Sequence, residues 1–265
     1  MYSKISIAFR YLCYYIKASN SRGHGIHSPF VYEFITKVLN DHRSFSAYSF
    51  VEQAKKKLLH DQAEIKFTDL GAGFQNMAMT RRSVSAIAKT SVSSRKFGRL
   101  LFRIANFYPV ETIFEMGTSL GISTAYLALG APSAVVVTME GSPEISSKAR
   151  QTFNLLGLNR IVQVTGNFDQ NISGVIEKYP PAGLVFLDGN HKKKAVIAYF
   201  ENILAKMPLS ATIIIHDIHW SNEMEEAWLY IKMHPAVKMS IDIFSAGLIF
   251  VRDEFKVKQH FTIRF

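Results

Sequence analysis

The chain has 265 residues, of which 48% are hydrophobic, and it contains one cysteine, Cys13. This length and composition fit one large folded domain, or one domain with an extension, and argue against a disordered chain. The single cysteine excludes an internal disulfide and any cysteine-based metal site. No run approaches the ~18 apolar residues that a membrane helix needs, and the first residues lack the cleavage site of a secretory signal. A cytoplasmic location is therefore expected.

The formal net charge of +10 comes from residues that are scattered along the chain. Only short clusters stand out, at residues 55–57, 81–82 and 192–194. No RNA-binding motif or zinc-ligand spacing accompanies them, so a solvated basic surface is the simplest interpretation. The charge leaves an anionic substrate or partner open, nucleic acid included.

Apolar residues recur at helical spacing throughout the first part of the chain. The predicted helices cover "ISIAFRYLCYYIKA", "SPFVYEFITKVLN", "YSFVEQAKKKLL", "SVSAIAKTS" and "RKFGRLLFRIANFY". Ser28 followed by Pro29 is typical of a helix start, and Ser93 or Ser94 is the expected start of the last helix. Residues 1–94 are predicted to form a helical extension or lid. The aromatic residues of the first helix suit packing, a homodimer contact or a roof over a substrate.

After residue 108, short β-branched runs alternate with helical patterns. The runs are "ETIFEMG", "AVVVTMEG", "RIVQVTGN", "AGLVFLDGN", "ATIIIHDI", "VKMSIDIF" and "GLIFVRD". Strands that alternate with helices predict a parallel α/β sheet. The last two runs have no helix between them and are joined by the short turn at residues 245–247, so they are predicted to form an antiparallel hairpin.

Two stretches combine an acid with closely following glycines: "DLGAGFQN" at residues 69–76 and "EMGTSLGIS" at residues 115–123. Only the second is followed by a helix and then by a strand that ends in an acid, Glu140, 19 residues beyond Gly121. Glycine lets the backbone approach a ligand, the helix N-terminus offers free N–H groups, and the acid accepts ribose hydroxyls. The second stretch is therefore the predicted cofactor site. The first is interpreted as a structural turn, with a pocket lid as the alternative.

With these motifs the chain resembles the class I S-adenosylmethionine-dependent methyltransferases, and within them the catechol and caffeoyl-CoA type of O-methyltransferase. The resemblance covers about residues 95–252. It implies a Rossmann-like α/β fold, with a seven-stranded methyltransferase sheet whose last strand is antiparallel. The methyltransferase domain would span residues 95–265 and follow the helical extension at residues 1–94. S-adenosylmethionine is the implied cofactor.

The resemblance also implies which residues bind the cofactor. The turn in "EMGTSLGIS" would face its methionine part, "TMEGSP" would hold the ribose, and "GNFDQ" would lie beside the adenine. The end of "VFLDGNH" would point at the active centre. The cofactor-binding residues expected on this basis are Glu115, Gly117, Thr118, Ser119, Gly121, Ser123, Glu140, Gly141, Gly166, Asn167, Phe168 and Asp188.

A hydroxyl group that accepts a methyl group must lose its proton to a base or through a metal ion. Candidate groups follow the fourth and fifth predicted strands: Asp188 and His191, then His216, Asp217 and His219. Parallel strands open their carboxyl ends on one edge of a sheet, where such folds bind ligands. The expected catalytic residues are His191, Asp188 and His219, with one of the two histidines as base. His216 suits a strand-end residue bonded to the backbone equally well.

Metal-dependent members of the resembled family hold magnesium with an aspartate after the fourth strand and an Asp-Asn pair after the fifth. Asp188 and Asp217 match the aspartates, but Ile218 stands where the asparagine belongs and His191 where those enzymes carry a lysine. No metal site is therefore expected, although the sequence leaves a divalent ion on Asp188 and Asp217 open.

The expected function is methylation of a small-molecule hydroxyl, with an acceptor that the sequence does not name. One alternative is a methyltransferase for RNA or protein, which the net charge keeps open. No "NPPY"-like tetrapeptide follows the fourth strand, however. The second alternative is an NAD-dependent oxidoreductase, but the turn from Gly117 to Gly121 lacks the G-x-G-x-x-G spacing of such enzymes.

Overall fold

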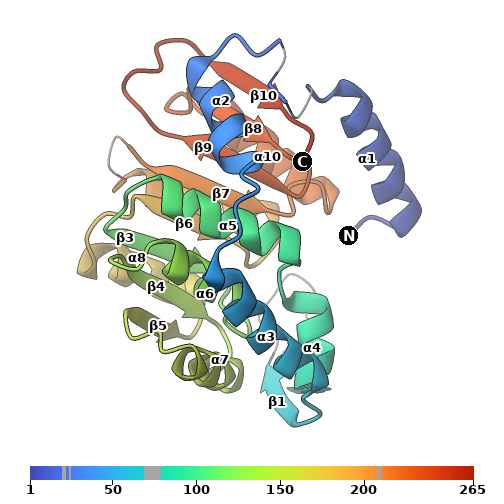
Figure 1. Ribbon diagram of the computed structural model, residues 1–265, viewed down its shortest axis with the longest axis vertical. Helices are drawn as coiled ribbons and strands as arrows, with labels where there is room; N and C mark the ends of the chain where they lie inside the picture. The colour runs from blue at the N-terminus through green and yellow to red at the C-terminus, as the bar shows by residue number, and fades with distance from the viewer. Residues whose placement is uncertain (20–21, 24, 69–78, 208–209) are drawn as a thin grey trace. The chain divides into compact units, whose positions relative to one another are not determined.

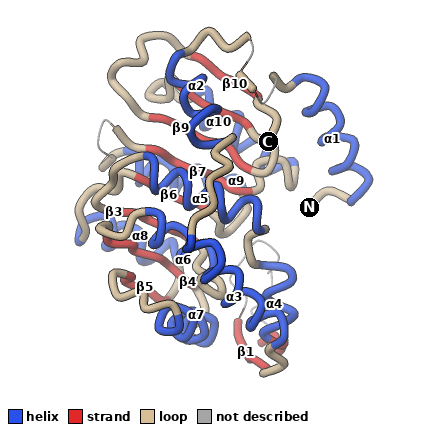
Figure 2. The backbone as a smooth tube through the Cα atoms, in the orientation of Figure 1, coloured by secondary structure: helices blue, strands red, loops and turns tan. Residues whose placement is uncertain are grey.

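The structure, a computed structural model, describes residues 1–19, 22–23, 25–68, 79–207 and 210–265. The chain divides into two compact units, one formed by Met1–Asp41 with Pro180–Phe265 and the other by His42–Tyr179. Figures 1 and 2 show that both units combine strands with helices. The division predicted after residue 94 stays a prediction, and the turn at residues 69–76 falls outside the described residues.

The unit His42–Tyr179 carries three parallel strands in the order β3-β4-β5. The strands are β3 (Thr112–Met116), β4 (Val135–Glu140) and β5 (Ile161–Thr165). The helices are α3 (Ser46–His60), α4 (Val84–Ser91), α5 (Arg95–Phe107), α6 (Ile122–Gly130), α7 (Pro143–Leu155) and α8 (Phe168–Lys178). All three strands were predicted, and the predicted start of α5 is confirmed because Ser94 Oγ accepts the N–H of Phe97.

The core of this unit forms where α5 packs against α6. Leu100, Leu101 and Ile104 are almost fully buried on one face of α5. Gly98 lets the two helices approach, since a Cβ there would lie 2.3 Å from the ring of Tyr126. Every residue of β3 is buried as well. This packing holds the carboxyl end of β3, and therefore the glycine turn that follows it, in a rigid frame.

A short hairpin in the same unit was not predicted. Strands β1 (Glu64–Thr68) and β2 (Met79–Ser83) pair antiparallel. The segment "EIKFT" does alternate polar and apolar residues, and Phe67 is buried. The helical patterns on either side outweighed that period-two signal, so no strand was predicted here.

The other unit carries five strands in the order β10-β8-β9-β7-β6. They are β6 (Leu184–Leu187), β7 (Thr212–His216), β8 (Met239–Asp242), β9 (Ala246–Phe250) and β10 (Gln259–Thr262). Strand β9 runs antiparallel to both β7 and β8, which confirms the predicted hairpin. Strand β10 pairs parallel to β8 and was not predicted, because its four exposed or half-exposed residues form no apolar run.

The helices of this unit are α1 (Lys4–Lys17), α2 (Pro29–Phe34), α9 (Lys193–Leu204) and α10 (Asn222–Met233), with a π-helical turn, η1, at Ile35–Leu39. Ser28 caps α2 and Pro29 is its first residue, as predicted. Ser19 forms a β-bridge with Ile263, so both ends of the chain lie in this unit. No helix in the described part of the chain is long and apolar enough to cross a membrane.

Candidate active site

The turn after β3 has a backbone that few sequences can adopt. Gly117, Ser119 and Gly121 all have positive φ, at 107°, 49° and 82°. The N–H groups of Gly117 and Thr118 both donate to the carbonyl of Met139 in β4, at 3.0 and 3.1 Å. Helix α6 begins directly afterwards, and no side chain caps its N-terminus among the described residues. The turn thus presents free helix N–H groups at the carboxyl end of the strands.

Replacing Gly121 with alanine is expected to lower the free energy of unfolding by about 2–4 kcal/mol. Its φ of +82° strains any side chain, and a Cβ would lie 2.5 Å from the ring of Phe153. Urea unfolding of the full chain measures the effect. Gly157→Ala, at φ +66° with open space around it, should cost only about 1 kcal/mol. Gly174→Ala, in open space on α8, should stabilise slightly. Equal losses for Gly121→Ala and Gly157→Ala would rule out the contact with Phe153.

Glu140 ends β4 with both carboxylate oxygens oriented by backbone donors. Oε2 accepts the N–H of Ser119 at 2.8 Å, and Oε1 accepts the N–H of Ser142 at 3.0 Å. Each carboxylate oxygen can accept further hydrogen bonds, so the side chain can still receive two hydroxyl donors. The Oγ of Ser119 is buried and makes no hydrogen bond within the described residues. A ligand seated in this turn would satisfy that atom.

Glu115 lies fully buried beneath the turn. Its Oε2 accepts hydrogen bonds from the hydroxyls of Thr124 on α6 and Thr138 on β4, the second at 2.6 Å. Thr118 is also buried, and its hydroxyl lies 2.6 Å from that of Thr138. Glu115 therefore ties the turn to its neighbours, and the role implied for it toward the cofactor stays a prediction.

The remaining residues expected around the adenine follow β5. Gly166 has a φ of 129° and donates its N–H to the carbonyl of Glu140 at 2.8 Å. Asn167 caps α8 through its Oδ1, which accepts the N–H of Asp169 at 2.8 Å. Phe168 is the first residue of α8 and is half-buried. The structure thus brings the ends of β4 and β5 together through Gly166, while contacts with adenine stay a prediction.

The other unit gathers acids and imidazoles at the ends of β6 and β7. Nδ1 of His216 lies 2.8 Å from Oδ1 of Asp188, and Nε2 of His191 lies 3.9 Å from the same oxygen. Asp217 has a φ of 57°, and its Oδ2 lies 3.7 Å from Nδ1 of His216. The His191 ring lies 5.3 Å from the Trp220 ring. The structure therefore brings Asp188, His191, His216 and Asp217, four of the five residues expected at this sheet edge, into one cluster.

His216 pairs with the side chain of Asp188, 2.8 Å away. Burial by itself lowers the pKa of an imidazole, but the charge and hydrogen bond of Asp188, with a further contribution from Asp217, raise the pKa of His216 to about 9. His216 is therefore a cation at neutral pH, bound to Asp188. The sequence signal was weak, because 28 residues separate the partners.

Because of this pair, the free energy of unfolding is expected to fall as pH rises from about 6.5 to about 9. The pKa of His216 is raised from 6.5 to about 9 in the folded chain. The pair of His216 with Asp188 therefore stabilises the fold fully at pH values below the unfolded pKa. This contribution, on the order of 2 kcal/mol, is lost as pH rises through the folded pKa. Urea unfolding across this range measures the slope, and His216→Gln should flatten it. An equal slope in the variant would refute the assignment.

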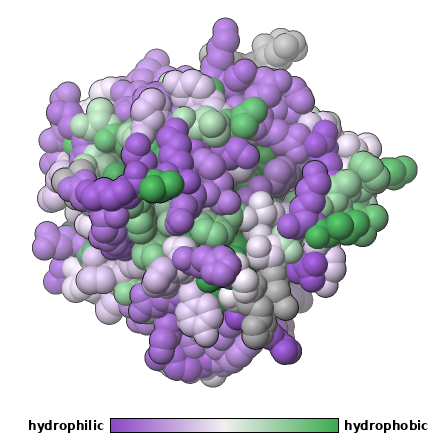
Figure 3. Space-filling view, turned by 90° about the horizontal axis from the view of Figure 1, so that it is seen from above, coloured by the Kyte–Doolittle hydropathy of each residue, from purple (hydrophilic) through white to green (hydrophobic). Residues whose placement is uncertain are grey.

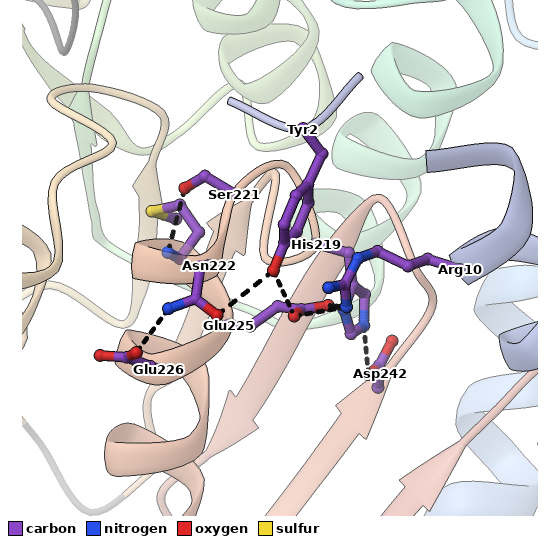
Figure 4. A network of polar contacts seen from close by, with 9 residues as sticks. Tyr2, Arg10, His219, Ser221, Asn222, Glu225, Glu226 and Asp242 are labelled. Carbon is purple, nitrogen blue, oxygen red and sulfur yellow. Dashed lines mark hydrogen bonds and ion pairs between the residues drawn. The ribbon is translucent and has the colours of Figure 1, made fainter. Parts of the chain in front are cut away.

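His219 lies in a different network, shown in Figure 4. Its Nδ1 lies 3.0 Å from Glu225 on α10, and its Nε2 lies 2.9 Å from Asp242 at the end of β8. Burial lowers the pKa of His219, but both carboxylates raise it by more. Glu225 also receives Arg10 of α1 at 2.6 Å and the hydroxyl of Tyr2 at 2.9 Å. Both ring nitrogens of His219 thus contact carboxylates, and its role as base stays a prediction.

Comparison with known proteins places this arrangement in a family. Residues 114–218 match the family described as "Methyltransferase domain". They include the glycine turn, Glu140 and the Asp188 cluster. Residues 114–218 therefore form a methyltransferase domain.

The resemblance to class I methyltransferases that the motifs indicated is thereby confirmed for this part of the chain. The chain is 26% identical over 147 residues to the catechol O-methyltransferase of Mycobacterium tuberculosis, a match covering 53% of this chain and 63% of that relative. The matched segment thus spans less than two thirds of the relative's length.

Two solved structures show the same fold. One is the O-methyltransferase of Bacillus cereus in complex with SAH, at 21% identity and a TM-score of 0.57, covering 84% of this chain and 97% of that chain. The other is an SAH-bound methyltransferase of Podospora anserina, at 16% identity and a TM-score of 0.59, covering 96% of this chain and 98% of that chain. Both confirm the predicted α/β methyltransferase fold.

The residues of the Asp188 cluster do not fit a magnesium ion well. Donor atoms of Asp188, His191 and Asp217 do lie within 4.8 Å of one another. Magnesium prefers six oxygen ligands, however, and Ile218 is fully buried and supplies none. The His216 cation also lies 2.8 Å from Asp188, where a second cation would be repelled. No catalytic step is therefore derived through a metal.

Proposed function

We propose that this protein transfers the methyl group of S-adenosylmethionine to a hydroxyl group of a small molecule, with His191 as the base. The observation that carries the proposal is the glycine turn, where Glu140 is oriented by the N–H groups of Ser119 and Ser142. The turn precedes a helix whose N-terminus has no side-chain cap, and the neighbouring strand ends in an acid. This arrangement suits an adenosine ligand.

In this proposal the residues of the turn bind the cofactor. Glu140 accepts the two ribose hydroxyls, since each of its oxygens retains acceptor capacity. The buried Oγ of Ser119 gains the hydrogen-bond partner that it lacks within the described residues. Gly166, Asn167 and Phe168 lie beside the adenine. S-adenosylmethionine supplies an electrophilic methyl group on a sulfonium sulfur.

The acceptor hydroxyl gives its proton to His191. The acceptor oxygen forms a bond with the methyl carbon while the bond from that carbon to sulfur breaks, and the proton ends on the imidazole. His191 is one-fifth exposed, close to Asp188 and to the ring of Trp220. The indole offers a flat apolar surface for an aromatic acceptor. The name of the relative, catechol O-methyltransferase, supports an aromatic hydroxyl as acceptor.

The partners and the place of action follow from the same proposal. The net charge of +10 favours an acceptor that carries negative charge. We place the reaction in the cytoplasm, where a chain with a single cysteine and a cytoplasmic cofactor would act. A homodimer and nucleic-acid binding stay open.

Thermal shift with ligands tests the cofactor. S-adenosylhomocysteine should raise the melting temperature because it binds only the folded chain, whereas NAD should leave it unchanged. Incubation with methyl-labelled cofactor and a panel of catechols, hydroxy acids, RNA and protein should then place the label in the small-molecule fraction. A shift with NAD alone would indicate an oxidoreductase, and label in RNA or protein would refute the small-molecule acceptor.

Metal removal is expected to leave activity unchanged. Methyl transfer to an acceptor found by that panel should proceed at the same rate before and after exhaustive chelation with EDTA. The reason is that His216 already supplies the positive charge beside Asp188. Adding magnesium should not raise the rate of the chelated protein. Complete loss with EDTA, restored by a divalent ion, would show that Asp188 and Asp217 bind a metal.

A further inference from the structure

Helix α1 carries a stripe of apolar side chains that point away from its own unit. Ile5, Phe9, Leu12 and Ile16 are exposed by 83%, 67%, 54% and 69%. Their spacing of four, three and four residues places them on one face of the helix. Figure 3 shows hydrophobic side chains gathered at the right-hand edge of the view, on the side where Figure 1 places α1.

The opposite face of α1 is firmly attached. Tyr14 is buried, and its hydroxyl donates to the carbonyl of Ile263. Arg10 forms an ion pair with Glu225 at 2.6 Å, which Figure 4 shows beside the hydrogen bond of Tyr2. With one face held in this way, the apolar stripe stays directed outward.

The charged residues of α1 itself are all positive. Lys4 comes one residue before Ile5 and Lys17 one residue after Ile16, so the two lysines lie about 100° to either side of the stripe. Helix α1 contains no acidic residue. The guanidinium of Arg264 adds a further cation at the last turn, where Nε donates to the carbonyl of Tyr15 at 2.9 Å.

We propose that α1 docks the protein onto the surface of an anionic phospholipid bilayer. The helix would lie in the plane of the interface, with the four apolar side chains among the upper acyl chains. Lysine stems can follow the apolar surface while their ammonium groups reach the phosphates. Anionic lipid attracts each such charge, and the net charge of +10 adds to the attraction at longer range.

A second copy of the chain is a poorer occupant of this stripe. Antiparallel pairing of two α1 helices would bring Ile5 of one copy near Ile16 of the other. It would also bring lysines together at both ends, with no acid on either helix to balance them. Four apolar side chains from each copy are also far fewer than the ~20–30 residues a side of a stable interface.

Flotation of the full chain with lipid vesicles tests the proposal. The protein should float with vesicles that contain phosphatidylserine and much less with vesicles of phosphatidylcholine alone. Phe9→Ser combined with Leu12→Ser should weaken the binding by about 10- to 100-fold, because two exposed apolar side chains no longer enter the bilayer. Lys4→Gln combined with Lys17→Gln should weaken it too, and salt should lessen that difference.

Matched controls separate α1 from the rest of the surface. Val257 is 70% exposed and lies outside α1, so Val257→Ser should leave vesicle binding unchanged. Lys89→Gln combined with Lys178→Gln removes the same charge from exposed positions elsewhere and should have a smaller effect. Equal binding by the α1 variants and the wild type would overturn the proposal. The proposal would also be overturned if the wild type did not bind vesicles but formed a dimer in light scattering that the α1 variants lose. The readout needs no cofactor or acceptor, so it is independent of the proposed methyl transfer.

Discussion

His191→Ala is expected to lower the single-turnover rate of methyl transfer by ~10²–10⁴ while leaving cofactor affinity almost intact. Removing a general base slows the step in which the acceptor loses its proton, whereas the cofactor is held by the glycine turn in the proposed function. Single-turnover transfer to an identified acceptor and calorimetric titration with S-adenosylhomocysteine measure the two quantities on the same variant.

His191 follows β6, His216 ends β7 and His219 follows β7. The surroundings of these three histidines differ. His216 and His219 contact carboxylates at 2.8–3.0 Å, and these contacts raise the pKa of both imidazoles, that of His216 to about 9. No carboxylate oxygen lies that near to His191 in the described residues, the contact with Asp188 being 3.9 Å. A base must be free to accept a proton, and this favours His191.

The controls for this prediction are the other imidazoles. His219→Ala should mainly lower stability, because it leaves Glu225 and Asp242 without the imidazole that contacts both. His191→Asn should be as slow as His191→Ala, since an amide retains polarity but is no base. Wild-type turnover in both His191 variants would remove that residue from the mechanism and return His219 to consideration.

Glu140→Ala is expected to weaken cofactor binding by roughly 1.5–3 kcal/mol, or about 10- to 150-fold in Kd. The variant removes the acceptor of two ribose hydroxyls and also the carboxylate that orients the N–H groups of Ser119 and Ser142. Calorimetric titration with S-adenosylhomocysteine measures the loss. Glu140→Gln should fall between the wild type and the alanine variant, because the amide keeps one acceptor oxygen.

Two other acids serve as controls for Glu140. Glu177 is exposed on α8, and Glu177→Ala should leave the affinity unchanged. Asp69 precedes the glycines of the other acid-and-glycine stretch and falls outside the described residues, and Asp69→Ala is also expected to have little effect. A larger loss for Asp69→Ala than for Glu140→Ala would mean that the cofactor site was assigned to the wrong turn.

Local pattern was enough to predict most of the elements that the structure shows. The β-branched runs predicted all seven strands from β3 to β9, because strands buried within a sheet form short continuous apolar segments. The helix caps at Ser28 and Ser94 could be predicted from the sequence, because a capping side chain bonds to a residue within one helical turn. The choice of the turn at Gly117–Gly121 rested on spacing along the chain to Glu140, and their contact through Ser119 agrees with it.

Partners that are distant along the chain were decided only by the tertiary structure. The pairing of His216 with Asp188 joins two strand ends, and the network around Glu225 reaches Arg10, 215 residues away. Strand β10 is recognisable only by its pairing with β8. Periodicity states which face of an element is apolar, but not which residue lies opposite it. By itself the sequence therefore determined the strands from β3 to β9 and their order along the chain. The folded chain decided that His216 is held as a cation by Asp188, that Glu115 is buried beneath the turn, and that α1 turns its apolar stripe outward.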